Sequence, residues 1–329
     1  MKLLRLAALA FSWVALVIGL ICVHAFIPQR SGPIALAEVL EPYIILTALL
    51  VAPLAFRFRP PAGRAAVVVI LMLTTFRYLP AWTSFPGSGP GEDVTAMTWN
   101  LLAGPDGGER SLEGILRSDA DLIGVQELQP QAAAVLVADG TLSSRLPYRA
   151  LAPDPSVLGI GLFSRYPIVD YEAWTDPPML RAEIAHPVGE SFTVLVVHPL
   201  PAAFGSVARV PVSLDTTRRD AAIARIWSII EEESRGGRSM LVLGDLNTTE
   251  REPAYAEFSN VLHDAHAVAG WGPGHTWRPQ SLAFLPFGLL RIDYIFGVQE
   301  MFPRSTFVDC NVPSDHCRLE ATFKWARLR

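Results

Sequence analysis

The chain has 329 residues, of which half are hydrophobic and 18% are charged, and its formal net charge is −5. That length exceeds one small domain and suffices for a large hydrophobic core. Charge is unevenly distributed: residues 1–82 hold seven Lys or Arg against two Asp or Glu, whereas residues 83–329 hold twenty against thirty. An acidic second part argues against non-specific binding to nucleic-acid backbones, which depends on basic side chains.

Three long apolar segments occupy the first 82 residues. They predict transmembrane helices over residues 6–27, 36–56 and 65–82, because each is long enough to cross the hydrocarbon core of a bilayer. The loop between the second and third segments holds Arg57, Arg59 and Arg64, whereas the loop before it holds only Arg30. The positive-inside rule therefore predicts a multi-pass anchor in a bacterial-type cell membrane, with residues after 82 outside the cytoplasm.

Two other interpretations of this part stay open. The stretch Ala35-Leu36-Ala37 has the form of a signal-peptide cleavage site, and cleavage there leaves the remainder on the same outer side. Buried core helices of a soluble protein are the second alternative, against which the biased loop charges argue. Residues 83–92, rich in Gly, Pro and Ser, are predicted as a flexible linker to a domain over residues 93–329.

The second part alternates strand-like and helix-like segments, with several direct strand-to-strand joins. This pattern predicts an α/β domain with mixed sheets. The longest helix is expected over residues 215–235, with Ile223, Ile226, Trp227 and Ile230 on its core face. Strands are expected over residues 94–99, 121–126, 158–164, 179–185, 192–197, 239–243, 292–296, 306–309 and 317–325, and two further helices over residues 111–117 and 129–138.

Polar residues recur where these strands begin or end. In Gly244-Asp245-Leu246-Asn247, an apolar strand ends in a glycine, and the two polar side chains that follow are two residues apart, so both can address one ligand. Each polar residue alone has an ordinary explanation as a turn or a solvated helix start. Their recurrence in one domain instead predicts a common site, formed by Asn100, Glu127, His198, Asp245, Asn247, Asp293, Asp315 and His316.

Six short motifs occur in an order that resembles the endonuclease/exonuclease/phosphatase superfamily, which includes DNase I-like nucleases, neutral sphingomyelinases and inositol polyphosphate 5-phosphatases. The resemblance implies a four-layer sandwich of two mixed β-sheets flanked by helices, preceded here by the transmembrane helices. The motifs are Thr98-Trp99-Asn100, Gln126-Glu127, Val197-His198, Gly244-Asp245-Leu246-Asn247, Ile292-Asp293-Tyr294 and Ser314-Asp315-His316.

The resemblance also implies roles in a phosphoester hydrolase. Glu127 with Asn100 would bind Mg²⁺, with Mn²⁺ as the alternative, and Asp315 would be a further metal ligand. Asp245 would orient or deprotonate the attacking water, while Asn247 and His198 would hydrogen-bond the phosphoryl oxygens. His316 would do the same, held in orientation by Asp293.

The substrate follows less directly. Nucleases of the family often carry a second carboxylate two residues after the first-motif asparagine, and Leu102 stands there, which argues against an abasic-site nuclease. The multi-span front resembles the membrane-bound bacterial members, including VanJ-type teicoplanin-resistance proteins. We therefore expect an extracytoplasmic phosphoesterase that acts on a lipid or lipid-linked phosphate at the bilayer; a nuclease acting on DNA or RNA and a non-catalytic binding module are the alternatives. The oligomeric state is left open.

The three cysteines show no metal-ligating spacing with one another or with histidine. Cys22 lies in the first apolar segment, and Cys310 and Cys317 are seven residues apart. A disulfide between the latter two would suit an extracytoplasmic domain. Of the two alternatives, we expect a pair of buried, unpaired thiols.

Overall fold

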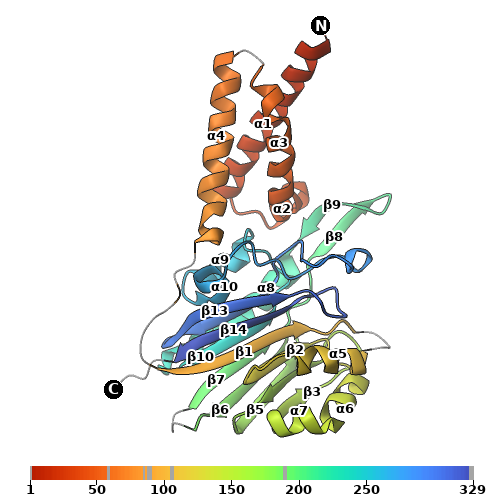
Figure 1. Ribbon diagram of the computed structural model, residues 1–329, viewed down its shortest axis with the longest axis vertical. Coiled ribbons are helices and arrows are strands. Elements are labelled where there is room, and N and C mark those ends of the chain that lie inside the picture. Colours follow the sequence, from red (N-terminus) through yellow and green to blue (C-terminus); the bar gives the residue numbers. More distant parts are fainter. Residues whose placement is uncertain are drawn as a thin grey trace. The chain divides into compact units, whose positions relative to one another are not determined.

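The computed structural model describes residues 2–57, 60–83, 86, 91–103, 107–187 and 191–325 (Figure 1). The chain forms two compact units. The first comprises the described residues up to Thr83 together with two later segments, Ala202–Thr217 and Arg251–Pro253, and the second comprises the rest. Most of the predicted linker, residues 83–92, lies outside the described residues.

The first unit begins with apolar helices. Lys2–Phe26 and Pro61–Trp82 are each long and apolar enough to cross a membrane, and Gly32–Val39 with Glu41–Ala55 is a third candidate, bent by 76° between its two helices. Pro42 lies at the start of the second helix of this bent pair, where its missing N–H costs no hydrogen bond. The helices are α1 (Lys2–Phe26), α2 (Gly32–Val39), α3 (Glu41–Ala55) and α4 (Pro60–Tyr78), followed by a 3₁₀ turn at Leu79–Trp82.

Contacts among α1, α3 and α4 are apolar along their length and polar at one end. Val14, Ala48 and Ile70 are fully buried between them. At the end of α1, His24 Nδ1 lies 2.7 Å from Glu41 Oε2 at the start of α3, and Glu41 also accepts a hydrogen bond from Arg77 near the end of α4. Because a buried carboxylate is costly unless it is paired, this cluster fixes these three helix ends side by side.

The second unit contains two six-stranded mixed sheets. The first has the strand order β13-β14-β1-β2-β4-β3 and the second the order β11-β12-β10-β7-β6-β5. In each sheet one central pair is parallel, β1 with β2 and β7 with β10. The first sheet contains β1 (Glu92–Asn100), β2 (Leu122–Gln126), β3 (Tyr148–Ala152), β4 (Ile160–Ser164), β13 (Met301–Asp309) and β14 (Arg318–Trp325). The second contains β5 (Ile168–Thr175), β6 (Pro178–Ala185), β7 (Ser191–Val197), β10 (Met240–Asp245), β11 (His263–Asp264) and β12 (Asp293–Val298).

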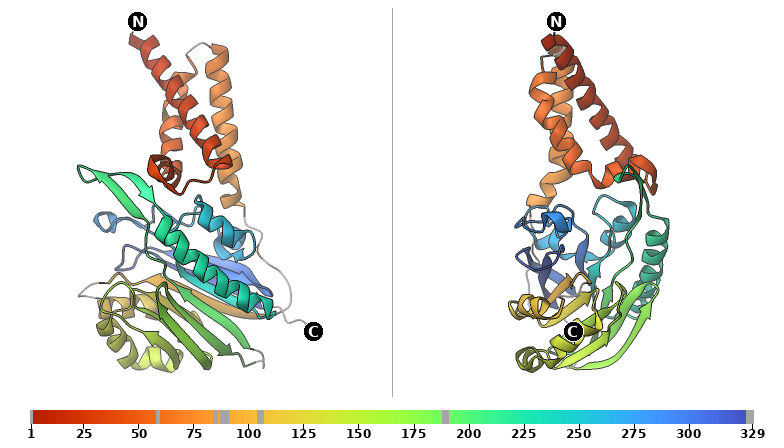
Figure 2. Two further views of the ribbon diagram at one scale, coloured as in Figure 1. Left: turned by 180° about the vertical axis from the view of Figure 1, so that it is seen from behind. Right: turned by 90° about the vertical axis from the view of Figure 1, so that its right-hand side faces the viewer.

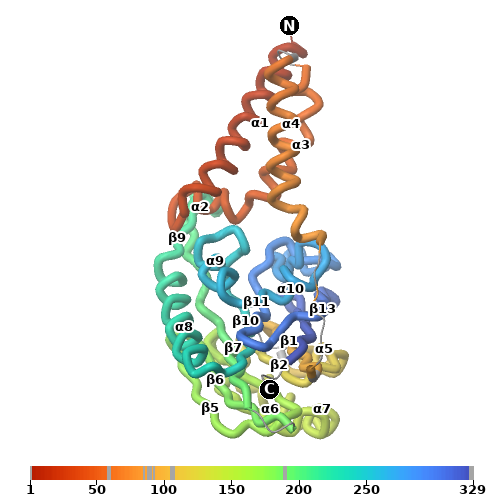
Figure 3. Tube along the Cα trace, turned by 90° about the vertical axis from the view of Figure 1, so that its left-hand side faces the viewer, coloured from red at the N-terminus to blue at the C-terminus, as the bar shows by residue number. Residues whose placement is uncertain are grey.

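Helices cover the outer faces of both sheets. Apolar side chains of the two sheets meet in a central core, for example Leu122 and Leu243. Figure 2 shows α8 lying across the second sheet, and Figure 3 shows α8 and α5–α7 on opposite sides of the strands. These four layers confirm the predicted sandwich. The helices are α5 (Gly107–Leu116), α6 (Pro130–Ala138), α7 (Gly140–Arg145), α8 (Thr217–Arg235), α9 (Pro253–Ser259) and α10 (Ala265–Ala269), with a 3₁₀ turn at Gln280–Leu282.

Several element predictions hold and others differ. The predicted core stripe of α8 is confirmed for Ile223, Ile226 and Ile230, which are buried, while Trp227 is partly buried and packs against the same core. The helix expected over residues 111–117 begins earlier, since α5 starts at Gly107 and Ser111 lies inside it. The sequence pattern did not predict β3, β5, β11, β8 (Ala203–Val207) or β9 (Val210–Asp215). The last two form a separate hairpin within the first unit. β8 shows no alternation of apolar and polar residues, whereas β9 alternates Val210, Val212 and Leu214 with other residues, a strand-like pattern that was not recognised.

Gly244 allows the carboxyl end of β10 to lie close against the backbone of β7. Its φ is +155°, and a Cβ there would lie 1.9 Å from the carbonyl oxygen of Val197 on the parallel neighbour. Only a residue without a side chain fits this approach.

We predict that Gly244→Ala lowers the free energy of unfolding by about 2 kcal/mol or more, because the clash with backbone cannot relax by rotating a side chain. Thermal unfolding of the full chain in detergent measures the effect. Gly140→Ala is the control, since a Cβ there meets nothing within 4 Å. Equal unfolding temperatures for both variants would contradict the prediction.

Candidate active site

The polar residues singled out in the sequence come together because of strand direction. The parallel pairs β1/β2 and β7/β10 end at one edge, which places Asn100, Glu127, His198 and Asp245 there. β12 runs antiparallel to β10 with Asp293 opposite Asp245, and β14 runs antiparallel to β1, so the strand that follows His316 starts at the same edge.

The Asp245 carboxylate is the centre of this cluster and is 1% exposed. Its Oδ2 accepts a hydrogen bond from Asn100 Nδ2 (3.1 Å) and lies 3.5 Å from His198 Nε2 and 3.7 Å from His316 Nε2. Burial alone would raise the pKa of Asp245, but the charge of His316 and the hydrogen bond and charge of His198 outweigh burial and lower it. Asp245 is therefore an anion at neutral pH.

Glu127 joins the cluster from the first sheet. Its Oε1 accepts a hydrogen bond from Asn100 Nδ2 (3.0 Å) and lies 3.9 Å from His198 Nε2. Its Oε2 accepts one from the backbone N–H of Ala103 (2.7 Å). Asn100 therefore presents its amide N–H groups to two carboxylates, while its Oδ1 accepts from the N–H of Leu102.

His316 and Asp293 form a buried charged pair. His316 Nδ1 lies 3.0 Å from Asp293 Oδ2, and Thr276 Oγ1 accepts a hydrogen bond from the Asp293 N–H (3.1 Å). Burial would lower the pKa of His316, but the charges of Asp293 and Asp245 raise it to about 10. Burial, with the charge of Asp245, raises the pKa of Asp293. At neutral pH His316 is an imidazolium whose Nε2 faces Asp245.

Backbone conformations at the site are unusual. Leu102, Glu127 and Asn247 have φ of +60°, +56° and +49°, a left-handed region that costs residues other than glycine about 1 kcal/mol or more. The Asn247 N–H donates to Asp245 Oδ1 (2.8 Å), and its side-chain amide donates to the Pro199 carbonyl (3.1 Å). The unfavourable turns are thus stabilised by hydrogen bonds to site residues.

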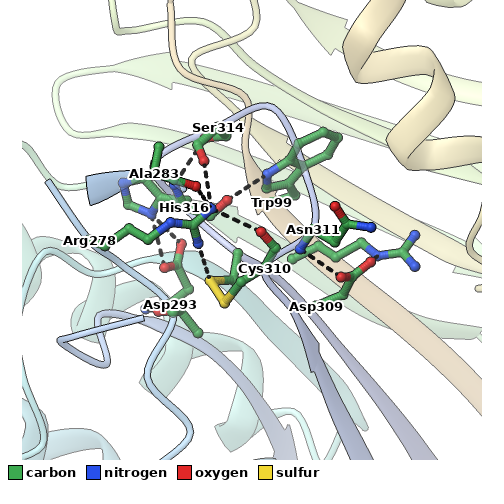
Figure 4. The surroundings of a disulfide bond; sticks show 12 residues. Trp99, Arg278, Ala283, Asp293, Asp309, Cys310, Asn311, Ser314 and His316 are labelled. Atoms are coloured by element: carbon green, nitrogen blue, oxygen red, sulfur yellow. Dashed lines mark hydrogen bonds and ion pairs between the residues drawn. A yellow bond between two sulfur atoms is a disulfide. The ribbon is translucent and has the colours of Figure 1, made fainter. Parts of the chain in front are cut away.

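A disulfide closes the loop that carries His316, between Cys310 and Cys317. Our expectation of unpaired thiols was wrong, because the loop between the two cysteines folds back on itself and brings their sulfurs together. The Arg278 guanidinium fills the loop (Figure 4), donating to the carbonyl oxygens of Cys310 (2.9 Å) and Ala283 (3.0 Å) and to Cys317 Sγ (3.0 Å). Arg278 itself is fully buried.

Two more hydrogen bonds hold this loop against the first sheet. Ser314 Oγ donates to the carbonyl of Asn100 (2.8 Å) and accepts from the His316 N–H (3.0 Å), and Trp99 Nε1 donates to the His316 carbonyl (3.2 Å). Nothing in the sequence indicated that Arg278 holds this loop, because an arginine in a Gly/Pro-rich stretch is typical of the surface. Ser314 and Trp99 were in the quoted motifs, but no role was assigned to them.

A compact carboxylate–imidazole group in the site includes none of the predicted metal ligands Asn100, Glu127 and Asp315. Asp245, Asp293 and His316 each offer an atom within 4.8 Å of the others, a spacing that could hold a metal ion. Asp315 is not in that group: its Oδ2 lies 3.3 Å from Trp277 Nε1, and its Oδ1 is buried without a hydrogen-bond partner among the described residues.

We predict that Asp293→Asn lowers the pKa of His316 from about 10 toward or below its usual 6.5, because it removes the nearest negative charge and leaves burial to act. Histidine NMR titration of the full chain, with His316→Gln to assign the resonance, measures this.

The same substitution changes how stability depends on pH. Because the folded pKa of His316 lies above 6.5, the pair contributes its full stability below about pH 6.5 and loses it as pH rises through about 10. The loss of unfolding free energy caused by Asp293→Asn is therefore expected to be largest below pH 7 and smallest above pH 10. An unchanged titration of His316 in Asp293→Asn would contradict the assignment.

Comparison with known proteins agrees with this geometry. The model of the Endonuclease/Exonuclease/phosphatase family matches residues 97–316, two thirds of the chain. Similar solved structures include an endonuclease/exonuclease/phosphatase from Bacteroides vulgatus (TM-score 0.53, 20% identity, 71% of this chain and 100% of that chain). Another is the 3′ phosphatase NExo from Neisseria bound to a product DNA hairpin (0.54, 16%, 70% and 100%).

A third similar structure is TDP2 from D. rerio complexed with a single-strand DNA product (TM-score 0.52, 16% identity, 71% of this chain and 99% of that chain). No curated protein matches the chain. The structural likenesses concern the fold, and the sequence match extends from β1 to His316 across the whole cluster. The chain belongs to the endonuclease/exonuclease/phosphatase family.

Proposed function

We propose that the protein is a membrane-anchored, Mg²⁺-dependent phosphoesterase that faces outside the cytoplasm and hydrolyses a lipid or lipid-linked phosphate. The observation that carries this proposal is the buried Asp245 carboxylate, which faces two imidazoles, in a chain that begins with apolar helices. Members of the family are phosphoesterases or nucleases, so the reaction class follows from membership.

The groups around Asp245 have matched chemical roles. An anionic Asp245 orients a water and accepts its proton as the water attacks phosphorus. The imidazolium of His316 donates a hydrogen bond to a phosphoryl oxygen and stabilises the charge that develops there. His198 donates a hydrogen bond to a second phosphoryl oxygen. Asn247 donates one to a third when its side-chain amide turns away from the Pro199 carbonyl.

The residues present suit a hard divalent cation. Glu127 offers carboxylate oxygens at the more exposed side of the cluster, and Mg²⁺ or Mn²⁺ prefers oxygen ligands. Asn100 would join Glu127 by presenting its amide oxygen, and the unpartnered Oδ1 of Asp315 is a further oxygen that could serve such an ion. When bound, the ion would neutralise charge on the phosphoryl group. The protonated state of His316 makes the Asp245–Asp293–His316 group the less suitable alternative.

Two features support an extracytoplasmic location. Arg57, Arg59 and Arg64 cluster in the sequence just before the apolar part of α4, a stretch that is expected to face the cytoplasm, so that residues after the last span face outward. The Cys310–Cys317 disulfide suits an oxidising compartment, since glutathione and thioredoxin keep most cytosolic thiols reduced.

Support for a lipid substrate comes from the loop before Asp293. Phe284 and Phe287 are 78% and 54% exposed, an arrangement that suits contact with lipid. A cavity of about 910 Å³ is bordered by this loop, by α5 and by the disulfide loop, and it is lined by Arg110, Arg117 and Phe284 among others. Its lining combines two arginines and one glutamate, Glu113, with apolar side chains, which fits a substrate with a phosphate and an apolar part.

A nuclease is the second candidate, which the two arginines of this cavity favour. The net negative charge of residues 83–329 opposes it, because binding to nucleic acid depends on neutralising phosphates.

The deciding experiment is a metal-dependent activity screen of the full chain in lipid nanodiscs. We expect release of phosphate or headgroup from a lipid phosphate, phospholipid or lipid-linked diphosphate with Mg²⁺, abolished by EDTA. Asp245→Ala and Glu127→Gln should lower the rate by about 10²-fold or more, since each removes a group that acts in the transition state. Cleavage of plasmid or single-stranded DNA or RNA, with no product from any lipid, would contradict the proposal and show that the protein is a nuclease.

We predict that Arg278→Gln lowers kcat by about 10²-fold with KM changed about twofold or less, because it misplaces His316 without touching the substrate. Hydrolysis of bis(p-nitrophenyl) phosphate with Mg²⁺ measures both constants. Reduction of the Cys310–Cys317 disulfide should act in the same direction. Arg304→Gln is the control, an exposed arginine 3.5 Å from Asp93. A rise in KM alone would place Arg278 in substrate binding instead.

A further inference from the structure

The hairpin β8–β9 connects β7 to α8 but folds with the apolar helices of the first unit. Arg30 lies four residues after the end of α1. Its carbonyl oxygen accepts two hydrogen bonds from Thr216, one from the backbone N–H (3.0 Å) and one from the side-chain hydroxyl (2.9 Å). The next two residues, Ser31 and Gly32, form antiparallel bridges with Asp215 and Leu214. The base of the hairpin is thereby fixed to the segment between α1 and α2, and Figure 2 shows it projecting beside α2.

The hairpin exposes more apolar surface than a two-stranded element in water normally carries. Phe204, Val207, Val210 and Val212 are 55%, 65%, 61% and 40% exposed. They come from both strands, and the pair Val207 and Val210 closes the turn. Isolated hairpins are marginally stable in water, and contiguous exposed apolar side chains mark a contact surface.

The low charge of the hairpin and its place next to α1 point to a lipid bilayer as the partner of its apolar surface. From Ala203 to Leu214 the only charged residue is Arg209, at the turn. The segment that holds the hairpin follows directly on α1, a candidate membrane span. That segment also exposes apolar side chains, with Phe26 83%, Ile27 56% and Ile34 43% exposed. The hairpin is thus fixed at the end of a span, where a bilayer changes from acyl chains to headgroups.

The turn places its charge at the outermost end. Ala208 and Arg209 have φ of +49° and +67°, so the strands are joined by a tight two-residue turn of the kind that usually requires Gly or Asn. A long basic side chain beside apolar residues suits the membrane interface, where the guanidinium binds lipid phosphates while its stem stays in apolar surroundings.

We propose that the β8–β9 hairpin lies in the outer membrane–water interface, with Phe204, Val207, Val210 and Val212 at the headgroup–acyl boundary and Arg209 on lipid phosphates. This proposal rests on the membrane anchoring proposed above and deepens it. The hairpin begins five residues after His198, and α8, which follows it, carries Arg219, whose guanidinium donates to the Asn247 carbonyl (2.7 Å). A lipid-bound hairpin is therefore linked through a few residues of chain to two residues of the candidate site.

The test uses environment-sensitive nitrobenzoxadiazole labels on the full chain in nanodiscs with and without brominated acyl chains. Cys22→Ser removes the free cysteine, and Val207→Cys or Phe204→Cys then takes the label in the hairpin. Val169→Cys on β5 is the matched control, because Val169 is 64% exposed and Val207 is 65%. The native Cys22, exposed on α1, reports separately whether the chain is inserted.

We expect the emission of both hairpin labels to shift to shorter wavelength. Brominated acyl chains should quench them at least half as strongly as they quench the Cys22 label. The Val169 label should show neither the shift nor the quenching. Quenching at Cys22 with none at Val207 and Phe204 would overturn the hairpin proposal and leave the anchoring intact. Absence of quenching at all labels would overturn both. Two hairpin positions guard against one variant that fails to fold, which thermal unfolding before labelling identifies.

Discussion

The structure depends on one buried carboxylate. Asp245 is almost completely removed from water, and an unpaired charge there would cost several kcal/mol. Its partners come from both sheets: Asn100 from the first, His198 from the second, and His316 from the loop that joins β13 to β14. The central packing of the two sheets therefore also assembles the site, because only their convergence supplies enough donors for this anion.

A second group of buried polar contacts holds the last of these donors in place. His316 lies in the loop between β13 and β14, and loops by themselves are seldom rigid. Three different constraints act on that loop: the Arg278 guanidinium, the Cys310–Cys317 disulfide and the hydrogen bonds of Trp99 and Ser314. The backbone on the opposite side of the site, at Glu127 and Asn247, is held in left-handed conformations instead. The loop that carries His316 is thus held by groups other than those proposed to act on the phosphoryl group.

How much the sequence could predict follows from the range of each interaction. Apolar periodicity predicted an α/β domain with mixed sheets, and the family resemblance of the ordered motifs implied the two-sheet sandwich. Asn100, Glu127, His198, Asp245, Asp293 and His316 meet at one edge because strand direction decides where strand ends meet. The Arg278 contacts could not be predicted, because they depend on loop geometry between residues up to 39 apart. The disulfide was missed for the same reason. The β8–β9 hairpin was missed although Val210, Val212 and Leu214 alternate in β9, because that pattern spans only six residues and β8 does not share it.

The central claim is that Asp245 and His316 act as one unit, the anion that activates water beside the cation that stabilises the phosphoryl group. A double-mutant cycle on kcat/KM for bis(p-nitrophenyl) phosphate, with Asp245→Ala, His316→Ala and both together, tests it most directly. If the two groups act together, the double variant should be about as slow as the slower single variant. Losses that multiply independently, or a single variant that retains full activity, would contradict the account.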